Sequence, residues 1–479
     1  MSLRQQTLAG FSWSFIQQMG VQGINFVVAL ILARILNPSD FGLIGMLTIF
    51  ISVGNALIDS GLSSSIIRTK DADQRDYSTV FVINLVGGIV IYCLIFLSSP
   101  MIATFFEQPI LEDVVKVYCL TFIIRAFSAV QAARLTKLMD FKTILVVTLP
   151  SIFLAGVAGI AMAYNGFGVW SLVWMNIIQA VLYSVQLWIR SKWTPSLMFD
   201  KARYKQHLSF GYKMTLSGLL DALYNNIYNI LIGKFFSATQ LGFYTKATSL
   251  KQLPVANIST ALNKVTFPMF AGIQDDDQRL RNAYKKLMQQ ILFWIAPTLC
   301  IAGVLAEPLF RFLLTEKWLP AVPYFQILCI TGITFPLHSY NLNVLKVKGR
   351  SDLFLKLEVI KRFVITGVIL IAINYGIYAL LWGEVFSNII GLLINSRYSG
   401  KLISYSLGQQ LLDMLPSLFV AALAGGCVYL VDFQLRSMYD VVRLVVGGTV
   451  GFCFYLGVSY TVSLQPLTEF RSVIFKKGQ

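Results

Sequence analysis

Long apolar stretches recur from one end of this chain to the other, and they constrain its fold more than any other feature. Each is about 20 residues long, the length that an α-helix needs to cross a bilayer. The strands of an outer-membrane barrel need only about 10 residues. Only 13% of the 479 residues are charged, against about 25% in a typical soluble protein. Lipid is therefore expected to surround most of the chain, and the predicted fold class is an all-α integral membrane protein.

The apolar stretches predict about fourteen transmembrane helices, with borders that are reliable to a few residues. They are expected near residues 11–36, 42–66, 79–104, 114–133, 143–163, 168–189, 209–235, 244–271, 288–314, 320–345, 355–374, 376–396, 411–431 and 441–463.

The loops between these spans alternate in charge. Basic loops such as 134–142 and 346–356 follow even-numbered spans, whereas acidic or short loops such as 37–40 and 107–113 follow odd-numbered ones. Short basic loops stay on the cytoplasmic side of a membrane, so both termini are expected to be cytoplasmic. The same pattern explains the net charge of +16 without a nucleic-acid partner.

The chain carries no motif of a soluble or membrane enzyme. We find no phosphate-binding glycine loop, nucleophile elbow or zinc-protease motif in a plausible context. The six cysteines all lie inside apolar stretches and lack metal-ligand spacing. No catalytic residue, metal or cofactor is expected, and transport would have to be driven by an ion gradient, the membrane potential or a substrate gradient.

Two halves of the chain resemble each other. Residues 31–44 resemble residues 231–244, and residues 167–174 resemble residues 375–382, so the offset grows only from 200 to 208. Parallel repeats of this kind are a recognised transporter architecture. The repeat-related pairs include Arg34 with Lys234, Asn25 with Asn225 and Gly42 with Gly242.

The repeat predicts four parts. Residues 1–190 form an N-terminal six-helix lobe and residues 209–400 a C-terminal six-helix lobe. Residues 191–208 form a cytoplasmic linker, in which aromatic residues suggest a helix lying at the membrane interface. Residues 401–479 add two transmembrane helices and a basic tail.

Ionisable and amide side chains inside the spans mark the candidate functional site, because a charge at mid-bilayer costs at least ~2.5 kcal/mol unless it faces water or a partner. The candidate cavity cations are Arg34, Arg125, Lys213, Lys234, Lys264, Lys361 and Arg362. A polar stripe on the first and seventh spans consists of Gln18, Gln22, Asn25, Ser217, Asn225 and Asn229. The candidate ion-coupling carboxylates are Asp59, Asp221 and Glu384.

Each of these assignments has a simpler alternative. Arg34 and Lys234 lie near span ends and can reach the lipid headgroups instead. Arg362 lies one helical turn from Glu358 and can form a local ion pair. The three carboxylates can be structural partners of the cations rather than protonation or Na⁺ sites. His338 is expected to be a hydrogen-bonded core residue, and His207 to be solvated.

The deep cations outnumber the deep anions, so a cavity that they line would attract an anion. Phosphate is the expected anionic group, because arginine and lysine both bind it.

Several motifs resemble the polysaccharide-export flippases of the multidrug/oligosaccharidyl-lipid/polysaccharide exporter superfamily. They are Leu32–Gly42 (LARILNPSDFG), Asp59–Leu62 (DSGL), Phe267–Phe270 (FPMF) and Glu316–Trp318 (EKW). Together with Leu345–Arg350, they follow the family's order over nearly the whole chain.

This resemblance implies a V-shaped pair of six-helix bundles with two extra C-terminal helices. It implies a flippase that moves an undecaprenyl-diphosphate-linked oligosaccharide across the bacterial inner membrane by alternating access. The implied partners are that glycan, the bilayer, H⁺ or Na⁺, and other polysaccharide-assembly membrane proteins.

Three other functions remain open at this point. A drug antiporter of the same superfamily would need an excess of buried carboxylates, and the sequence shows the reverse. Flipping of a peptidoglycan precursor is a neighbouring possibility. A membrane glycan polymerase or acyltransferase would need a catalytic constellation or a large outer loop.

Overall fold

The computed structural model describes residues 3–59, 61–196 and 198–475. Its contacts divide the chain into two compact units, Met1–Gly242 and Phe243–Gln479. The described residues form α-helices and two short 3-10 helices, with no strand among them. The predicted fold class, an all-α integral membrane protein, is therefore confirmed. The V-shaped placement of two lobes stays a prediction.

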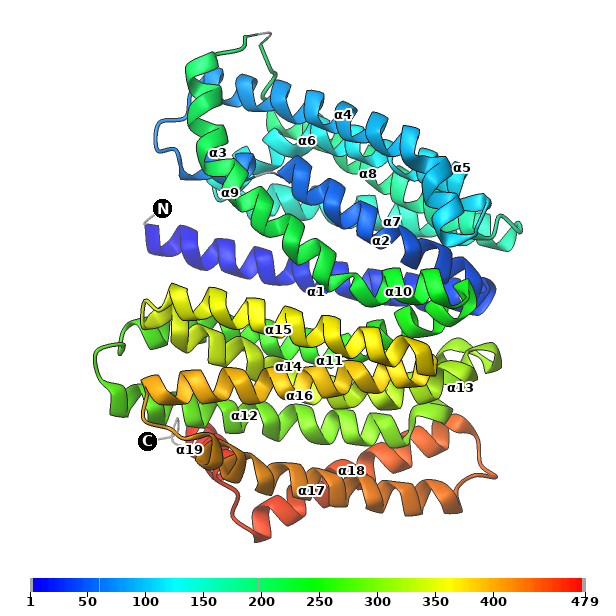
Figure 1. Cartoon of the computed structure of the whole chain (residues 1–479), viewed down its shortest axis with the longest axis vertical. Helices are drawn as coiled ribbons and strands as arrows, with labels where there is room; N and C mark the ends of the chain where they lie inside the picture. The colour runs from blue at the N-terminus through cyan, green and yellow to red at the C-terminus, as the bar shows by residue number, and fades with distance from the viewer. Residues whose placement is uncertain (1–2, 60, 197, 476–479) are drawn as a thin grey trace. The chain divides into compact units, whose positions relative to one another are not determined.

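The first unit is built from ten helices and the start of an eleventh (Figure 1). These are α1 (Leu3–Ile35), α2 (Pro38–Asp59), α3 (Leu62–Arg68), α4 (Gln74–Phe106), α5 (Ile110–Tyr118), α6 (Leu120–Lys137), α7 (Phe141–Tyr164), α8 (Val169–Ser191), α9 (Lys201–Asn225), α10 (Ile227–Phe235) and the first turn of α11 (Ala238–Ala271). Helix α1 packs on α7, α7 on α8, and α4 on α6.

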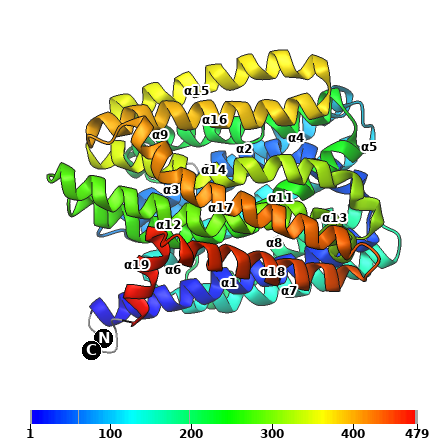
Figure 2. The same ribbon diagram turned by 90° about the horizontal axis from the view of Figure 1, so that it is seen from below.

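The second unit contains the rest of α11 and the remaining helices. These are α12 (Asp277–Val304), α13 (Ala306–Leu314), η1 (Glu316–Ala321), α14 (Val322–Val347), α15 (Ser351–Ala372), η2 (Ile373–Tyr375), α16 (Ile377–Leu402), α17 (Leu407–Gln434), α18 (Asp440–Thr461) and α19 (Gln465–Phe475). Helices α15 and α16 run side by side in Figure 2. Helix α14 packs on α16, and α17 packs on both α12 and α18.

Ten helices among the described residues are long and apolar enough to cross a membrane. The other four predicted spans coincide with α6, with α9 and α10 together, with α11 and with α15. These four carry most of the candidate charges: Arg125, Lys213, Asp221, Lys234, Lys264, Lys361 and Arg362. The helices that are least suited to lipid are therefore the ones expected to line a polar interior.

The order of helices repeats between the two halves of the chain. Helix α2 begins at Pro38 and α11 at Ala238, which keeps the offset of 200. Helices α7 and α15 begin at Phe141 and Ser351, and α8 and α16 begin at Val169 and Ile377. The packing boundary nevertheless falls elsewhere, because α9 and α10 pack on α2 and α4 and so belong to the first unit. The lobe boundary near residue 209 stays a proposal based on the sequence repeat.

The glycine pair at offset 200 marks a close crossing of α2 and α11. A Cβ built on Gly42 would lie 1.7 Å from the carbonyl oxygen of Ala238, and one built on Gly242 would lie 1.9 Å from the carbonyl oxygen of Pro38. Pro38 and Ala238 are themselves related by the repeat. The contact is therefore reciprocal, and only a residue without a side chain fits at either position.

The segment after α8 does not form the expected interfacial helix. Lys192 has a left-handed φ of 48° and ends α8, and the described residues 192–196 and 198–200 are not helical. Trp193 is buried instead, with its ring edge-on to Tyr77 and its indole N–H donating to Gln74 at 2.6 Å. Trp193 therefore packs specifically against α4.

The start of α9 is fixed to α3 and α4 by a buried ionic network. Asp76 is fully buried, and its carboxylate accepts from Arg203 at 3.0 and 3.1 Å and contacts His207 Nε2 at 3.1 Å. The other ring nitrogen of His207 lies 2.8 Å from the hydroxyl of Ser65. The expectation that His207 is solvated was wrong, because its side chain is 0% exposed and fully hydrogen-bonded.

Candidate functional site

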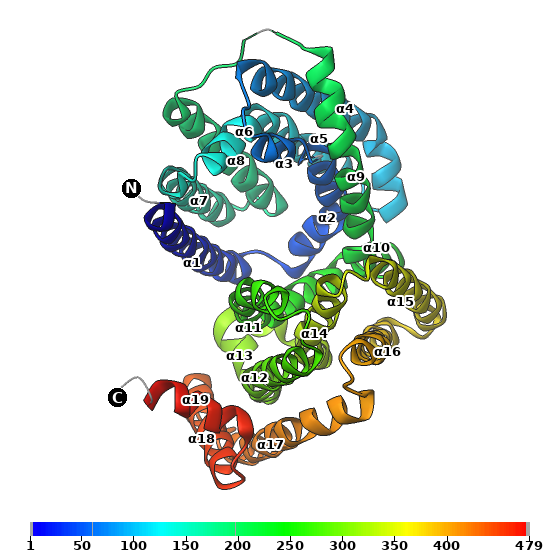
Figure 3. The same ribbon diagram turned by 90° about the vertical axis from the view of Figure 1, so that its left-hand side faces the viewer.

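A polar pocket of about 450 Å³ lies inside the first unit. Five helices contribute to its wall, namely α1, α2, α6, α7 and α8, and they lie around a common interior in Figure 3. Its lining residues are Gln17, Asn55, Ile58, Arg125, Ser128, Ala129, Ala132, Thr148, Gln179, Ala180 and Tyr183. Four of these five helices are apolar enough to span a membrane, so the pocket is a polar interior within an apolar unit.

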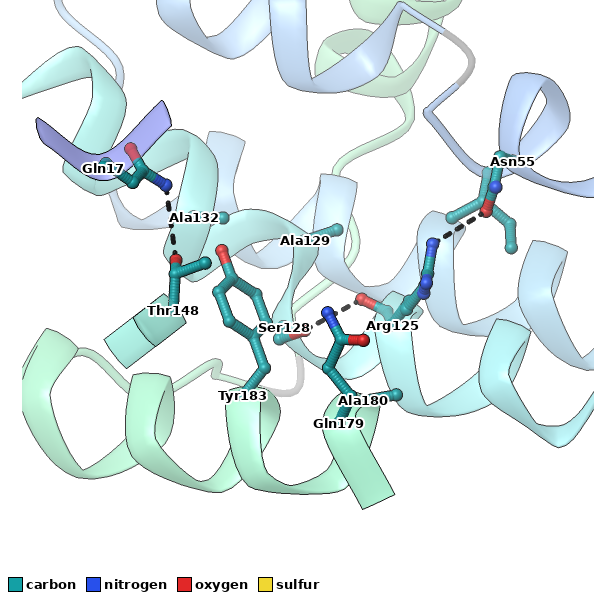
Figure 4. Close-up of a pocket in the computed structure, with 11 residues that line it drawn as sticks. Gln17, Asn55, Arg125, Ser128, Ala129, Ala132, Thr148, Gln179, Ala180 and Tyr183 are labelled. Atoms are coloured by element: carbon teal, nitrogen blue, oxygen red, sulfur yellow. Dashed lines mark hydrogen bonds between the residues drawn. The ribbon is translucent and has the colours of Figure 1, made fainter. Parts of the chain in front are cut away.

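Arg125 provides the charge in this pocket (Figure 4). Helix α6 carries it, and its guanidinium donates to the amide oxygen of Asn55 on α2 at 3.4 Å. The side chain is exposed, and no carboxylate pairs with it among the residues that the structure describes. An amide oxygen does not neutralise a guanidinium, so this cation remains able to bind an anion.

The remaining polar groups of the pocket are neutral. Gln17 donates to the hydroxyl of Thr148 at 3.3 Å, and the hydroxyl of Ser128 donates to the backbone carbonyl of Arg125 at 3.2 Å. Gln179 and Tyr183 on α8 also face this interior (Figure 4). Amide and hydroxyl groups of this kind can hydrogen-bond to the hydroxyl groups of a sugar.

The polar stripe predicted on the first span lies next to the pocket rather than in it. Gln18, Gln22 and Asn25 are absent from the lining, whereas Gln17 points into it. A helix turns by about 100° per residue, so one position decides which amide faces the pocket. The sequence pattern located the polar part of this helix, but only the packing of α1 on α7 selected Gln17.

The polar stripe predicted on the seventh span falls where the helix is interrupted. Helix α9 ends at Asn225 and α10 begins at Ile227. Asn229 donates to Thr48 at 3.0 Å, and Asn226, which the stripe did not include, donates to Ser52 at 3.1 Å. These hydrogen bonds attach the break between α9 and α10 to α2. Ser217, Asn225 and the candidate coupling residue Asp221 are exposed.

The two repeat-related cations at span ends also lie outside the pocket. Lys234 pairs with Glu107 at 2.9 Å and sits 5.3 Å from the ring centre of Phe105. Through this hydrogen bond and its charge, Lys234 lowers the pKa of Glu107 below its ordinary value. Arg34 is exposed at the end of α1. Neither Lys234 nor Arg34 is among the residues that line the pocket.

In the second unit, the predicted cation Lys361 is paired. Its ammonium lies 2.5 Å from Glu358, one turn earlier on α15. Glu358, for which Arg362 was an expected local partner, thus has Lys361 beside it. Arg362 is half-buried and takes part in further interactions.

Glu384, the third candidate coupling residue, lies in a polar cluster of the second unit. Its carboxylate accepts from the hydroxyl of Tyr244 at 3.1 Å, and Lys251 is within electrostatic reach. Lys251 is 8% exposed and donates to Thr331 at 3.1 Å. Lys246 is also buried, with its ammonium 5.6 Å from the ring centre of Trp318. Sequence reasoning did not single out Lys246, because nothing in its neighbourhood along the chain marks it.

Three of the predicted site residues cannot be placed. The side chains of Asp59, Lys213 and Lys264 lie outside the described residues.

The fold of this chain matches the folds of solved membrane transporters. It matches a structure titled as the lipid II flippase MurJ in an inward closed conformation, with a TM-score of 0.77 and 12% identity over 94% of this chain and 99% of that one. It also matches an inward-facing multidrug resistance MATE family transporter of the MOP superfamily, with a TM-score of 0.64 and 18% identity over 80% and 94% of the two chains. The chain has the multi-pass helical fold of these transporters.

A family model described as "Polysaccharide biosynthesis protein" matches residues 31–323, and the chain belongs to this family. The teichuronic acid biosynthesis protein TuaB of Bacillus subtilis is 27% identical over 100% of this chain and 99% of its own length. The lipopolysaccharide biosynthesis protein WzxC of Escherichia coli is 26% identical over 78% and 76%. The succinoglycan biosynthesis transport protein ExoT of Rhizobium meliloti is 24% identical over 77% and 75%.

Proposed function

We propose that this protein is a flippase that moves an undecaprenyl-diphosphate-linked oligosaccharide from the cytoplasmic to the outer leaflet of a bacterial inner membrane. The observation that carries the proposal is Arg125, an arginine that faces a polar pocket in a membrane unit and that has an amide as its one hydrogen-bond acceptor among the described side chains. An arginine within a membrane-spanning unit is costly unless it faces water or an anion. A diphosphate is an anion that a guanidinium binds strongly.

The relatives support a glycan as the cargo. Their names refer to teichuronic acid, lipopolysaccharide and succinoglycan, which are all polysaccharides, and one of them is named a transport protein. Amide, hydroxyl and aromatic groups around Arg125 suit the sugar part of such a substrate. The lipid tail would remain in the bilayer.

The remaining parts of the proposal follow from the sequence. Both termini are cytoplasmic, because basic loops follow the even-numbered spans. The six-helix lobes at residues 1–190 and 209–400 rock by alternating access around the glycan, and H⁺ or Na⁺ supplies the energy. Arg125 and Lys361 bind the diphosphate, and Lys213, Lys264 and Arg362 extend the cationic lining. Polysaccharide-assembly proteins of the membrane deliver or receive the glycan.

Two other functions are less well supported. The likeness to a MATE transporter concerns the fold alone, and a site for cationic drugs would need unpaired carboxylates, whereas the charge in the first-unit pocket is an arginine. A polymerase or acyltransferase is not favoured, because the relatives are named for biosynthesis and transport without any enzymatic reaction.

A leaflet assay tests the proposal directly. The full chain is reconstituted in proteoliposomes that hold undecaprenyl-diphosphate oligosaccharide in one leaflet, and appearance of the glycan in the other leaflet is followed with a membrane-impermeant glycosidase. We expect protein-dependent translocation. Translocation no faster than in protein-free liposomes, with or without a pH or Na⁺ gradient, would overturn the proposal.

A further inference from the structure

The ring of His338 on α14 lies between two asparagines of α16. Its Nε2 is 3.0 Å from the amide oxygen of Asn388, and its Nδ1 is 3.2 Å from the amide nitrogen of Asn395. Thr334 also donates to the amide oxygen of Asn388, at 2.6 Å. Because an amide oxygen only accepts and an amide nitrogen only donates, Nε2 carries the hydrogen and Nδ1 is bare. These contacts define a neutral ring whose Nδ1 lone pair accepts a hydrogen bond from Asn395.

The amide of Asn395 has an unused acceptor. Asn395 is 0% exposed, and its Oδ1 has no hydrogen-bond partner within the described part of the chain. Native structures rarely leave a buried polar atom unsatisfied, and such an atom calls for a functional or solvent explanation. Proton uptake at Nδ1 of His338 supplies a functional explanation, because rotation of the Asn395 amide by half a turn then presents Oδ1 to the new N–H.

The two asparagines therefore suit both states of the ring. With a neutral ring, Asn395 donates to Nδ1; with a protonated ring, Nδ1 and Nε2 each donate to an amide oxygen. The imidazolium is fully hydrogen-bonded without any repacking of α14 or α16.

Charged residues of α15 stand beside this ring. A Cβ built on Gly391 would lie 3.3 Å from His338 Cε1 and 3.4 Å from Lys361 Cδ, so the glycine lets the lysine stem and the ring approach each other. Lys361 opposes a positive ring and its partner Glu358 favours one. Lys251 on α11 donates to Thr331, one turn from Thr334. On α16, Glu384 lies one turn before Asn388 and accepts from Tyr244, and Arg397 follows Asn395 by two residues.

We propose that His338, with Asn388 and Asn395, is a proton-binding site whose occupancy is linked to anion binding at Lys361. This inference rests on the proposed function, in which Lys361 contacts the diphosphate. In the binding step, hydronium transfers its proton to the Nδ1 lone pair and leaves as water, while Nε2 keeps its hydrogen. The ring changes from neutral to singly positive, and the Asn395-to-Nδ1 hydrogen bond reverses direction.

The linkage has a fixed sign. A diphosphate at Lys361 neutralises the cation that opposes protonation, so bound anion favours the imidazolium. By reciprocity, protonation of His338 must tighten anion binding by the same factor. Affinity for the lipid diphosphate is therefore expected to rise as the pH falls.

The test measures binding of undecaprenyl diphosphate to the full chain in nanodiscs at pH 4.5 and pH 7.5. His338→Gln keeps a neutral hydrogen-bonding side chain, and its pH response reports only the titration of the lipid phosphates. We expect the wild type to tighten on acidification about 5-fold more than His338→Gln, near the lower end of typical coupling. Asn395→Leu, which removes the amide that receives the new N–H, is expected to reduce this difference.

A matched control is Thr298→Val, to be compared with Thr334→Val. The hydroxyl of Thr298 donates to the carbonyl of Trp294 in its own helix, so its loss is expected to leave the pH response as in the wild type. Identical pH responses in the wild type, His338→Gln and Asn395→Leu would overturn the inference while leaving the flippase proposal intact. Absence of binding by the wild type at both pH values would instead count against the proposed substrate.

Discussion

An arginine of the first unit and an arginine of the second unit have different kinds of hydrogen-bond partner. In the first unit, Arg125 faces a pocket and is hydrogen-bonded to an amide. In the second unit, Arg443 on α18 makes two hydrogen bonds of 2.9 Å to Asp432 on α17. An arginine that is paired with a carboxylate of the neighbouring helix holds the two helices together, whereas one with a neutral partner remains available to a ligand.

This difference teaches that the identity of a charged residue does not reveal its role. Arg125 and Arg443 are both arginines within helices of the transmembrane region. Arg443 is 3% exposed, and its partner Asp432 is 7% exposed, so the pair is a buried link between α17 and α18. The following changes test whether the contrast between an available and a paired arginine holds.

The largest effect is expected from Arg443→Met. It leaves the buried carboxylate of Asp432 without its partner, which costs about 3–5 kcal/mol of stability. Thermal unfolding of the purified protein in detergent measures the loss. The double variant Asp432→Leu/Arg443→Met removes both charges and is expected to recover most of it. Arg350→Met breaks the exposed pair with Asp352 and should change the unfolding temperature far less, because solvent screens an exposed ion pair. Equal losses in Arg443→Met and Arg350→Met would contradict a structural role for the buried pair.

Arg125→Gln is expected to have the next largest effect, on transport rather than on stability. Removing one partner of a charged contact costs about 2 kcal/mol or more, which corresponds to a translocation rate about 30-fold lower. Arg190→Gln, at an exposed position near the end of α8, is the matched control and should translocate at the wild-type rate. The leaflet assay measures both. A normal rate for Arg125→Gln would remove Arg125 from the site.

Gly42→Ala tests the close crossing in the first unit. Its new methyl group would overlap the carbonyl oxygen of Ala238, and such overpacking typically costs about 1–3 kcal/mol. Gly242→Ala should cost a similar amount, since it faces the carbonyl of Pro38 in the same way. Gly87→Ala on α4 is the control, because nothing lies within 4 Å of its added Cβ. If Gly42→Ala lowered the unfolding temperature no more than Gly87→Ala does, α2 and α11 would be able to move apart at little cost, and the close crossing would not be a constraint.

The smallest effect is expected at the exposed pair of Lys234 and Glu107. Because Lys234 lowers the pKa of Glu107, this carboxylate adds stability above its ordinary pKa of 4.5 and loses it as the pH falls through the lower folded value. The small advantage of the wild type over Glu107→Gln in thermal unfolding should therefore be present at pH 6 and vanish in strong acid. An advantage that grows on acidification would have the wrong sign.

The sequence alone determined the helical membrane class, most helix positions and the repeat. Apolar length and loop charge act locally along the chain, so they can be read without a structure. The repeat also marked Gly42 and Gly242 as a pair. It could not show that Gly42 packs against Ala238 at the start of α11, or that Gly242 packs against Pro38 at the start of α2.

Only the tertiary structure decided which polar residues meet. Arg125 acquires Asn55, 70 residues away, Gln17 rather than Gln18 faces the pocket, and His207 is buried against Asp76, 131 residues away. These outcomes depend on the rotation of each helix about its axis and on partners from distant segments. Those are set by packing between helices, which the order of residues along one helix does not contain.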